Sequence, residues 1–474
     1  MTKQQNLGSP NWLTKFETQT LFDLVEAGGG ELRVVGGCVR DSLRDPSGGD
    51  GVEFDIDMAC NLSPDRLIEI FSAAGLKTIP TGIAHGTISV IVASNKGDAN
   101  NNGNNNGNNN GNNNGDKSIY EITTLRKDVI TDGRHAQVEI TDDWVEDARR
   151  RDFTINALYA DRNGQVYDWL ADEGFSGLID LEANRVRFIG EPAARISEDY
   201  LRILRFFRFH FRLAPSLPLD ANSLAACGSA ADEIPRLSGE RICAELLQIL
   251  ALPSAFLAMR AMQDAGVLKH VLASAGEFAR LEKLVQIFDA WHIPNAADPI
   301  LRLSTCLAAP ENEANNNQIL ASEIAQALRL SRRSADRLKQ FLACEVLAFE
   351  AKGRMPNLDL SLTSDRLRQA LFLIGDKSAL LDQILLAWAA DPRATPVNRE
   401  CQVSSAWKRQ IDCLHKLELP VFPLTGAMLI DMGLAPGPNM GNVLKETQNW
   451  WCDANFKPGL SDLQAYAASI MQLP

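Results

Sequence analysis

The sequence lacks the long apolar runs that membrane proteins need. No window approaches the roughly 18 uninterrupted apolar residues of a membrane-spanning helix. The first residues, MTKQQNLGSPNWLTKF, are polar where a signal peptide has an apolar centre. These absences exclude a membrane-embedded chain and predict a cytoplasmic protein with no membrane partner.

Paired cysteines and an excess of positive charge are also missing. The nine cysteines are scattered singly without a Cys-x-x-Cys pair, which argues against a disulfide framework and a structural zinc site. The 47 lysines and arginines are outnumbered by 60 acidic residues, giving a net charge of −13. Because a protein that binds phosphate backbones indiscriminately is usually basic, any nucleic-acid partner must be met by a local basic surface.

What is present divides the chain in two. Residues 191–474 consist mainly of leucine, alanine, arginine and glutamate at helical spacing, interrupted by prolines. Residues 1–190 hold short β-rich runs, namely Leu32–Val35, Val52–Met58, Thr87–Val92, Ile119–Thr124 and Val166–Trp169. The pattern predicts an α+β chain in which a head with strands and helices precedes an all-helical remainder.

One segment has almost no chemical variety. Asn100–Gly115 reads NNNGNNNGNNNGNNNG and offers neither an apolar face nor charge, so ordering it would bring no compensating burial. It lies between two predicted strands, and we expect a disordered hairpin tip over residues 95–117. Pro46–Gly51 is predicted to be a second, shorter insertion.

A pair of glycines follows the first predicted strand, in the segment Gly36-Gly37-Cys38-Val39-Arg40-Asp41. Such a turn lets backbone N–H groups approach a phosphate, and Arg40 adds a cation one turn later. The segment matches neither G-x-G-x-x-G nor a Walker A sequence, which argues against a dinucleotide fold and a P-loop ATPase. A plain connector between strand and helix is the alternative.

The segment Glu53–Met58 alternates acidic and apolar residues. In a strand, the acidic side chains point to one face and the apolar ones to the other. Asp55 and Asp57 would then offer hard oxygen ligands for Mg²⁺ beside the phosphates of a nucleotide. A solvated acidic strand edge is the alternative.

Glu121 lies on another predicted strand, with Tyr120 and Ile122 on the opposite face. If this strand neighbours that of Asp57, Glu121 adds a third carboxylate, which would orient an attacking hydroxyl or complete a metal shell. A cross-strand ion pair is the alternative.

Three consecutive arginines, Arg149, Arg150 and Arg151, form the next motif. They cannot share one helix face, so at least one points toward whatever cleft is present, where a triphosphate is a natural counter-charge. A solvated basic turn paired with Glu146 and Asp147 is the alternative.

The segment Ser197–Arg212 predicts an amphipathic helix with start signals at Ser197 and Glu198. One side is apolar, and four arginines fall within an arc of about 120° on the other. These arginines are Arg202, Arg205, Arg208 and Arg212. They form the local basic surface that the net charge hides; a solvated amphipathic helix is the alternative.

Asp199 and Arg202 place a hydrogen-bond acceptor next to a donor. Cytosine and adenine present an amine donor beside a ring-nitrogen acceptor, whereas guanine and uracil present a carbonyl acceptor beside an N–H donor. The pair therefore suits C and A, and a mismatch with G or U would leave buried groups unpaired.

Taken in order, these motifs resemble those of the class II tRNA nucleotidyltransferase and bacterial poly(A) polymerase family. The matching stretches lie within residues 32–212 and read GGCVRD, DID, AHGT (Ala84–Thr87), YEITTLR, EDARRRDFTINAL and EDYLRILRFFRF. Residues Pro423–Leu444 resemble the tail region of CCA-adding enzymes.

The resemblance implies a head with a small mixed β-sheet, followed by a helical neck, body and tail that grip tRNA. We expect the head over residues 1–185, the neck with a nucleotide-selecting helix over residues 186–270, and the body and tail over residues 271–474. The implied activity is template-independent addition of CMP and AMP, from CTP and ATP, to the 3′ end of tRNA, with Mg²⁺ as cofactor and no obligate protein partner.

The resemblance also assigns roles to residues. The catalytic carboxylates are Asp55, Asp57 and Glu121, of which Asp55 and Asp57 bind Mg²⁺. The residues implied to bind the nucleotide are Gly36, Gly37, Arg40, Arg151, Asp199, Arg202, Arg205 and Arg208. Arg134 and His135 lie in what resembles a mobile loop between head strands.

The chain departs from the family pattern in two places. Leu43-Arg44 stands where the family usually has Leu-Gly, and residues 46–53 make a longer approach to the carboxylate strand. No His-Asp dipeptide occurs, so the phosphohydrolase domain of some relatives is not expected.

Other functions stay open: a poly(A) polymerase, an enzyme that adds only CC or only A, and a non-catalytic RNA-binding protein on the same fold. Residues 450–474 hold Lys457 against Asp453 and Asp462. They are not the basic tail expected of an enzyme that grips arbitrary RNA, which favours CCA addition.

Overall fold

The computed structural model describes residues 5–45, 56–83, 86–93, 117–131, 136–272, 276, 278–293, 297–307, 314–350 and 362–471. Contacts group the chain into two units. The first comprises Met1–Leu237 and Ala261–Val271, and the second comprises Ser238–Arg260 and Leu272–Pro474.

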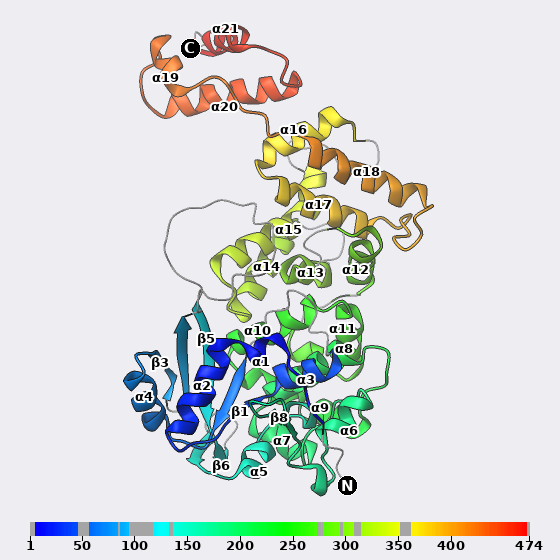
Figure 1. The fold of residues 1–474 in the computed structure, drawn as a ribbon. Coiled ribbons are helices and arrows are strands. Elements are labelled where there is room, and N and C mark those ends of the chain that lie inside the picture. The colour runs from blue at the N-terminus through cyan, green and yellow to red at the C-terminus, as the bar shows by residue number, and fades with distance from the viewer. Residues whose placement is uncertain are drawn as a thin grey trace. The chain divides into compact units, whose positions relative to one another are not determined.

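The first unit is built on a mixed β-sheet (Figure 1). Its strands are β1 (Leu32–Val35), β2 (Asp57–Cys60), β3 (Lys77–Gly82), β4 (Thr87–Ala93), β5 (Lys117–Thr124), β8 (Tyr159–Ala160) and β9 (Val166–Tyr167). They lie in the order β3-β4-β5-β2-β1-β8-β9, and among these described strands β2 pairs with β5 in parallel while the other pairs are antiparallel. A second sheet pairs β6 (Arg126–Thr131) with β7 (Ala136–Ile140).

The strands predicted at residues 32–35, 87–92 and 119–124 are confirmed. Of the strand predicted over Val52–Met58, Asp57 and Met58 lie in β2, which continues to Cys60, whereas Ile56 precedes the strand and residues 52–55 lie outside the described ranges. β9 ends at Tyr167, two residues before the predicted end, and β3, β6, β7 and β8 were not predicted. These unpredicted strands are short or of mixed polarity, so they lack a clear period-two signal.

The two faces of the main sheet differ in polarity. Met58 and Ile122 point to a buried face, against which α2 (Phe16–Ala27) and α4 (Pro64–Ala73) pack. On the other face, Ala59 joins a core cluster, but the preceding Asp57 on that face is exposed. The sheet therefore presents an acidic position at the edge of its own core.

β4 and β5 form an antiparallel pair that ends with Ala93 opposite Lys117. Residues 94–116, which contain the Asn/Gly run, connect the two strands and lie outside the described residues. The prediction that the run separates two hairpin strands is confirmed, although Lys117 belongs to β5 and not to the insertion.

The first unit has further helices. They are α1 (Asn11–Thr14), α3 (Gly37–Arg44), α5 (Trp144–Arg149), α6 (Gly177–Glu182), α7 (Pro192–Glu198), α8 (Leu201–Leu213) and α9 (Ala221–Ser229), with short 3₁₀ turns at Thr154–Asn156, Ala171–Glu173, Ala231–Arg236 and Leu268–His270. Of these helices, α3 contacts β1 and α5 contacts β6, whereas α7 packs against α8 and α9.

The second unit is helical throughout its described residues. Its helices are α10 (Gly239–Ala251), α12 (Ala279–Trp291), α13 (Pro299–Cys306), α14 (Ala314–Ala327), α15 (Arg332–Glu350), α16 (Ser364–Ile374), α17 (Lys377–Ala390), α18 (Gln402–Lys416), α19 (Gly426–Asp431), α20 (Pro438–Asp453) and α21 (Leu460–Met471), and α11 (Ala255–Asp264) contributes to both units. The predicted α+β architecture is confirmed. In the described ranges no helix combines the length and the apolar character needed to span a membrane.

Candidate active site

Asp57 and Glu121 occupy facing positions on two neighbouring strands. β2 pairs with β5 in parallel, and Asp57 is the register partner of Glu121. Both residues are exposed, whereas Tyr120 and Ile122 are buried on the opposite face, as the alternation predicted. The condition under which Glu121 would approach the acidic strand is therefore met.

These carboxylates have the chemistry of a divalent-cation site. Carboxylate oxygens on a rigid strand pair are ligands suited to hard cations such as Mg²⁺. Asp55 lies outside the described residues, as do Ala84, Arg134 and His135. In the part of the chain that is described, no group of three His, Cys, Asp or Glu side chains is gathered for a metal. The described residues thus supply Asp57 and Glu121, and the contribution of Asp55 stays a prediction.

The glycine turn lies directly beside Asp57. Gly36 has φ +77°, a left-handed conformation that favours glycine, and its N–H bonds to the Leu158 carbonyl at 3.0 Å. Burial, and next the negative charge of Asp57, raise the pKa of the Cys38 thiol to about 12. Because Val34 of β1 pairs with Met58 of β2 in antiparallel register, the end of β1 that leads into the glycine turn lies beside the start of β2 at Asp57.

Arg40 lies in the first turns of α3 and is only 2% exposed. Its Nη1 donates to Asn156 Oδ1 at 2.6 Å, while Nε and Nη2 donate to the two Asp41 carboxylate oxygens at 2.8 and 2.9 Å. The guanidinium thus fixes the segment that follows the glycine turn. A contact between Arg40 and a triphosphate stays a prediction.

The three consecutive arginines separate into two groups. Arg149 is exposed and pairs with Glu146 and Glu173, as the solvated alternative expected. Arg150 and Arg151 instead turn inward toward one buried carboxylate, Asp147.

Asp147 is fully buried and accepts hydrogen bonds from three side chains. Arg150 Nη2 donates at 2.6 Å, Arg151 Nη2 at 3.1 Å and the Tyr159 hydroxyl at 2.7 Å. Burial alone would raise the pKa of the Asp147 carboxyl, but the charges of Arg151 and Arg150 outweigh it and lower the pKa to about 2. Arg151 is therefore held in a buried network, and its predicted contact with a triphosphate is untested.

Asp152 is a residue that the sequence did not single out. Its Oδ2 accepts from Arg205 Nε at 2.8 Å, and its Oδ1 accepts from Asn156 Nδ2 at 3.1 Å. Burial opposes ionisation, yet the charge of Arg205 and the hydrogen bond from Asn156 lower the pKa of Asp152 to about 2. Its position directly after the three arginines was the available signal.

The helix predicted to start near Ser197 is two helices. α7 ends at Glu198, Asp199 is extended with φ −156°, and α8 begins at Leu201. Ser197 Oγ donates to the Ala194 carbonyl inside α7, so it does not start the next helix. Asp199 Oδ1 accepts from the Leu201 N–H at 3.1 Å, two residues on, and so stabilises the turn that leads into α8.

Arg202 is anchored by protein groups. Its Nη1 donates to Glu198 Oε2 at 2.5 Å and to the Arg195 carbonyl at 2.8 Å, and its Nη2 donates to the Arg150 carbonyl at 3.2 Å. Arg195 Nη2 donates to the carbonyls of Arg150 and Arg151. The segment before α8 is therefore tied to the arginine turn, and the pairing of Asp199 with Arg202 for base selection stays a prediction.

Arg208, the last of the nucleotide-site arginines, lies over the Phe209 ring at 4.4 Å. The apolar side of α8 is buried as predicted, with Ile203, Leu204, Phe206 and Phe207 at 0% exposure.

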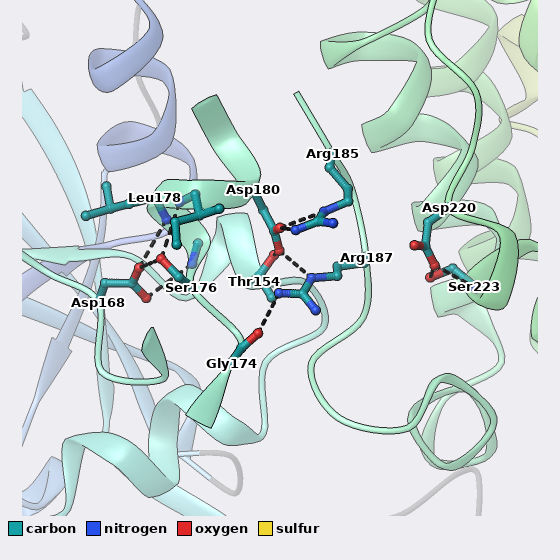
Figure 2. Close-up of polar contacts among 12 residues, drawn as sticks. Thr154, Asp168, Gly174, Ser176, Leu178, Asp180, Arg185, Arg187, Asp220 and Ser223 are labelled. Carbon is teal, nitrogen blue, oxygen red and sulfur yellow. Dashed lines mark hydrogen bonds and ion pairs between the residues drawn. The ribbon is translucent and has the colours of Figure 1, made fainter. Parts of the chain in front are cut away.

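A second buried carboxylate, Asp180, supports the 3₁₀ turn Thr154–Asn156, which follows Asp152. Figure 2 shows Asp180 between Thr154, Arg185 and Arg187. Thr154 Oγ1 and Arg187 Nε each lie 2.6 Å from Asp180 Oδ2, and Arg185 Nε lies 2.7 Å from Oδ1. Because Asp180 is fully buried, these charge-assisted bonds fix Thr154 firmly.

Models of known protein families match two segments of the chain. Residues 32–187 match the Poly A polymerase head domain, and residues 217–275 match the family described as "Probable RNA and SrmB- binding site of polymerase A". The first match contains the glycine turn, both carboxylate strands and the three arginines.

Relatives align along nearly the whole chain. "CCA tRNA nucleotidyltransferase 1, mitochondrial" of Mus musculus is 28% identical over 472 residues, covering 97% of this chain and 92% of the relative. The "CCA-adding enzyme" of Streptococcus gordonii is 29% identical over 468 residues, covering 95% and 96%.

Two solved structures share the fold. The Bacillus stearothermophilus CCA-adding enzyme in complex with CTP has a TM-score of 0.63 at 22% identity, covering 96% of this chain and 97% of that one. The Thermotoga maritima CCA-adding enzyme complexed with tRNA has a TM-score of 0.56 at 19% identity, covering 95% and 94%.

Proposed function

Because the chain belongs to the family of class II tRNA nucleotidyltransferases and bacterial poly(A) polymerases, we propose that it adds CMP and AMP to the 3′ end of tRNA and so completes or repairs the CCA terminus. The chain is a nucleotidyltransferase, and its substrates in this proposal are CTP, ATP and tRNA. No obligate protein partner is proposed.

One observation carries the proposal: the register of Asp57 with Glu121, beside the Gly36 turn. Two carboxylates on neighbouring strands beside a glycine turn are parts that metal-assisted nucleotidyl transfer needs. The alternative of a solvated acidic edge gives no reason for that juxtaposition.

Nucleotidyltransferases of this family use a divalent metal, and we propose Mg²⁺ held by Asp55 and Asp57, with Glu121 as the third carboxylate. When bound, Mg²⁺ neutralises charge on the triphosphate and lowers the pKa of the primer hydroxyl. In this proposal Gly36 gives the turn its conformation, since its own N–H donates to the Leu158 carbonyl, and the Gly37 backbone N–H binds a phosphate oxygen, with Arg40 and Arg151 behind it.

Base choice is proposed to lie with α8 and the residues before it. Asp199 and Arg202 offer the acceptor and donor that match cytosine and adenine, and Arg205 and Arg208 complete the nucleotide site. Replacing Asp199 with alanine should therefore weaken discrimination against GTP and UTP more than it weakens triphosphate affinity.

Incubation of the purified chain with tRNA lacking its terminus, CTP, ATP and Mg²⁺ tests the activity. We expect labelled CMP and AMP in products that end in CCA on sequencing. No incorporation, alongside an active control enzyme, would defeat the proposal.

The same assay separates the alternatives. With ATP alone, a poly(A) polymerase makes long products, whereas a CCA-adding enzyme adds a single A to tRNA ending in CC. An enzyme that adds only CC stops after the second C, and an enzyme that adds only A acts only on tRNA that already ends in CC. Alignment with CCA-adding enzymes over more than 90% of their length favours CCA addition.

A cytoplasmic location is the remaining part of the proposal. Relatives include proteins whose names place them in mitochondria, so imaging of the tagged full-length chain in its own host is the test. Signal confined to an organelle would contradict it.

A further inference from the structure

Two arginines of α8 connect it to α3, the helix that begins at the glycine turn, by donating hydrogen bonds to aspartates. Arg205 and Arg212 lie seven residues apart and therefore on the same side of α8. Arg205 Nε donates to Asp152 at 2.8 Å, and Arg212 Nη2 donates to Asp41 at 2.8 Å. Asp41 is on α3 itself, whereas Asp152 belongs to the turn after the three arginines.

Both acceptors lead to the same buried cation, Arg40. Arg40 bonds directly to Asp41, and it reaches Asp152 through one side chain, Asn156. The contacts thus close a ring that runs from Arg40 through Asn156 and Asp152 to Arg205, along α8 to Arg212, and back through Asp41.

A single ring of Phe209 fills the space between these cations. The guanidinium carbons of Arg40, Arg205 and Arg208 lie 5.1, 5.3 and 4.4 Å from its centre. Phe209 is 6% exposed and Arg40 is 2% exposed, so the cation–π contact between these two lies away from bulk water and is stronger than a surface one. The contact between Phe209 and Arg40 therefore gives α8 a further attachment to α3, at a position between the ion pairs of Arg205 and Arg212.

Asn156 is the one neutral member of the polar ring, and its chemistry is specific. It must accept from Arg40 and donate to Asp152 at the same time, which an amide does and a carboxylate or a hydrocarbon does not. Asn156 is 7% exposed and Asp152 is 8% exposed, so losing the bridge leaves buried charged groups short of a partner.

We infer that Asn156 is a positioning residue for base selection: it fixes the nucleotide-selecting face of α8 relative to the glycine turn. This inference rests on the proposed function, because it assigns base choice to α8 and phosphate binding to the turn. Asn156 acts through Arg40, Asp152 and Arg205 and does not itself need to touch the nucleotide.

The main test is Asn156→Leu, which keeps the size of the side chain and removes both hydrogen bonds. We measure kcat and KM for CTP, ATP, UTP and GTP separately, and inhibition by inorganic triphosphate. The ratio of kcat/KM for UTP and GTP to that for CTP and ATP should rise about tenfold, the effect of one charge-assisted hydrogen bond. The inhibition constant for inorganic triphosphate should change less than this ratio does, because Arg40 keeps both bonds to Asp41 and the backbone of the turn is unchanged.

Tyr120→Phe is the matched control. It removes a buried hydrogen bond, from the Tyr120 hydroxyl to Thr18, on the opposite face of the sheet. Tyr120→Phe should lower the unfolding temperature without changing the ratio. Asn156→Ala, which puts no bulk beside Arg40, should reproduce the altered ratio if Asn156→Leu folds poorly. An unchanged ratio in both Asn156 variants, or an equal loss for all four nucleotides, would overturn the inference.

A double-mutant cycle on stability keeps the inference separate from the activity. Asn156→Leu and Arg205→Met should together lower the unfolding temperature by less than the sum of their single effects, because they break one network. Asn156→Leu with Tyr120→Phe should be additive. Additivity in the first cycle overturns the inference, whereas a wild-type chain that incorporates neither CMP nor AMP overturns the proposed function.

Discussion

The most deeply buried charges of the first unit bond to side chains of other elements, whereas those of the second unit, Arg302 and Asp391, bond to backbone groups or to a close neighbour. The long-range ion pairs from Arg337 to Asp298 and Asp382, also in the second unit, are partly exposed. In the first unit Arg40 bonds to Asn156, Asp152 to Arg205 and Asp180 to Thr154, each from a distant part of the sequence, and Asp147 accepts from Tyr159 besides its neighbours Arg150 and Arg151. In the second unit Arg302 donates to the carbonyls of Leu250 and Leu252, and Asp391 pairs with Arg393, two residues away.

This difference separates a functional arrangement from a structural one. A buried ion pair rarely adds stability beyond what a well-packed apolar pair of the same volume gives. A cation that binds two carbonyls secures the end of a helix, which explains Arg302. Several mutually paired ions gathered around the glycine turn fix the directions of side chains, and directions are what a site for nucleotides requires.

The largest expected effect comes from Asp57, which is charged and exposed in contrast to the buried ions around it. Asp57→Asn should lower incorporation of CMP into tRNA on the order of a thousandfold, because it weakens charge stabilisation at the reacting phosphate. Its unfolding temperature should match the wild type. Asp65→Asn, an exposed aspartate on α4, is the control. An Asp57→Asn enzyme as active as that control would contradict the assignment.

Acid should unfold the first unit before the second. The pKa values of Asp147 and Asp152 are lowered to about 2, below the ordinary 3.8, so their contribution is present above pH 4 and is lost as the pH falls through 2. Each is worth on the order of 2 kcal/mol. In the second unit, the pKa of Asp391 is also lowered to about 2, and its contribution to stability is lost in the same way. Burial instead raises the pKa of Asp382 to about 6. The contribution of Asp382 to stability is therefore present below pH 4 and is lost as the pH rises through 6.

Hydrogen exchange of peptides from each unit, measured from pH 5 to pH 2, checks this order. Asp147→Asn should be less stable at neutral pH but should lose less stability on acidification. Equal protection of both units along the whole titration would show that the buried carboxylates of the first unit are not the acid-sensitive groups.

A smaller effect, on stability and not on nucleotide selection, is expected from Arg302 in the second unit. Burial lowers the pKa of Arg302 to about 10. Arg302→Met should lower the free energy of unfolding by about 1–2 kcal/mol through its lost bonds to carbonyls, with nucleotide selection unchanged. Arg329→Met, at an exposed arginine, should leave stability unchanged. Altered nucleotide selection in Arg302→Met would contradict the view that this buried charge of the second unit has only a structural role.

The smallest effect is expected from shortening the Asn/Gly run. Deleting residues 100–111 leaves the Ala93–Lys117 pair and roughly halves the chain that links β4 to β5, which changes the loop-closure free energy by about 0.6 kcal/mol. Incorporation of CMP and AMP should be unchanged. A loss of activity would assign this run a role that its composition does not suggest.

The parts of the site that depend on local pattern were predictable. Glu121 and Asp57 alternate with buried residues, and that period marks which face each side chain takes. The break at Asp199 was missed because Ser197, Glu198 and Asp199 all resemble helix-start residues, and only the extended backbone of Asp199 decides among them.

The buried polar network was not predictable, because its members meet only through the fold. Asn156 lies far from Arg40 in sequence, and an isolated asparagine in a 3₁₀ turn carries no sign of its partner. The same holds for Arg195, whose acceptors are carbonyls of the arginine turn. Sequence spacing describes faces of helices and strands, not which faces come together.

The parallel pairing of β2 with β5 also sets an order of events while the chain is being made. β1 and β2 are complete once residue 60 has left the ribosome, but Glu121 follows only after the whole Asn/Gly run has been translated. At about 5–20 residues per second, the run delays the arrival of β5 by about 1–3 s. The β2 edge at Asp57 therefore gains its partner strand, and with it Glu121, only after the Asn/Gly run has been made.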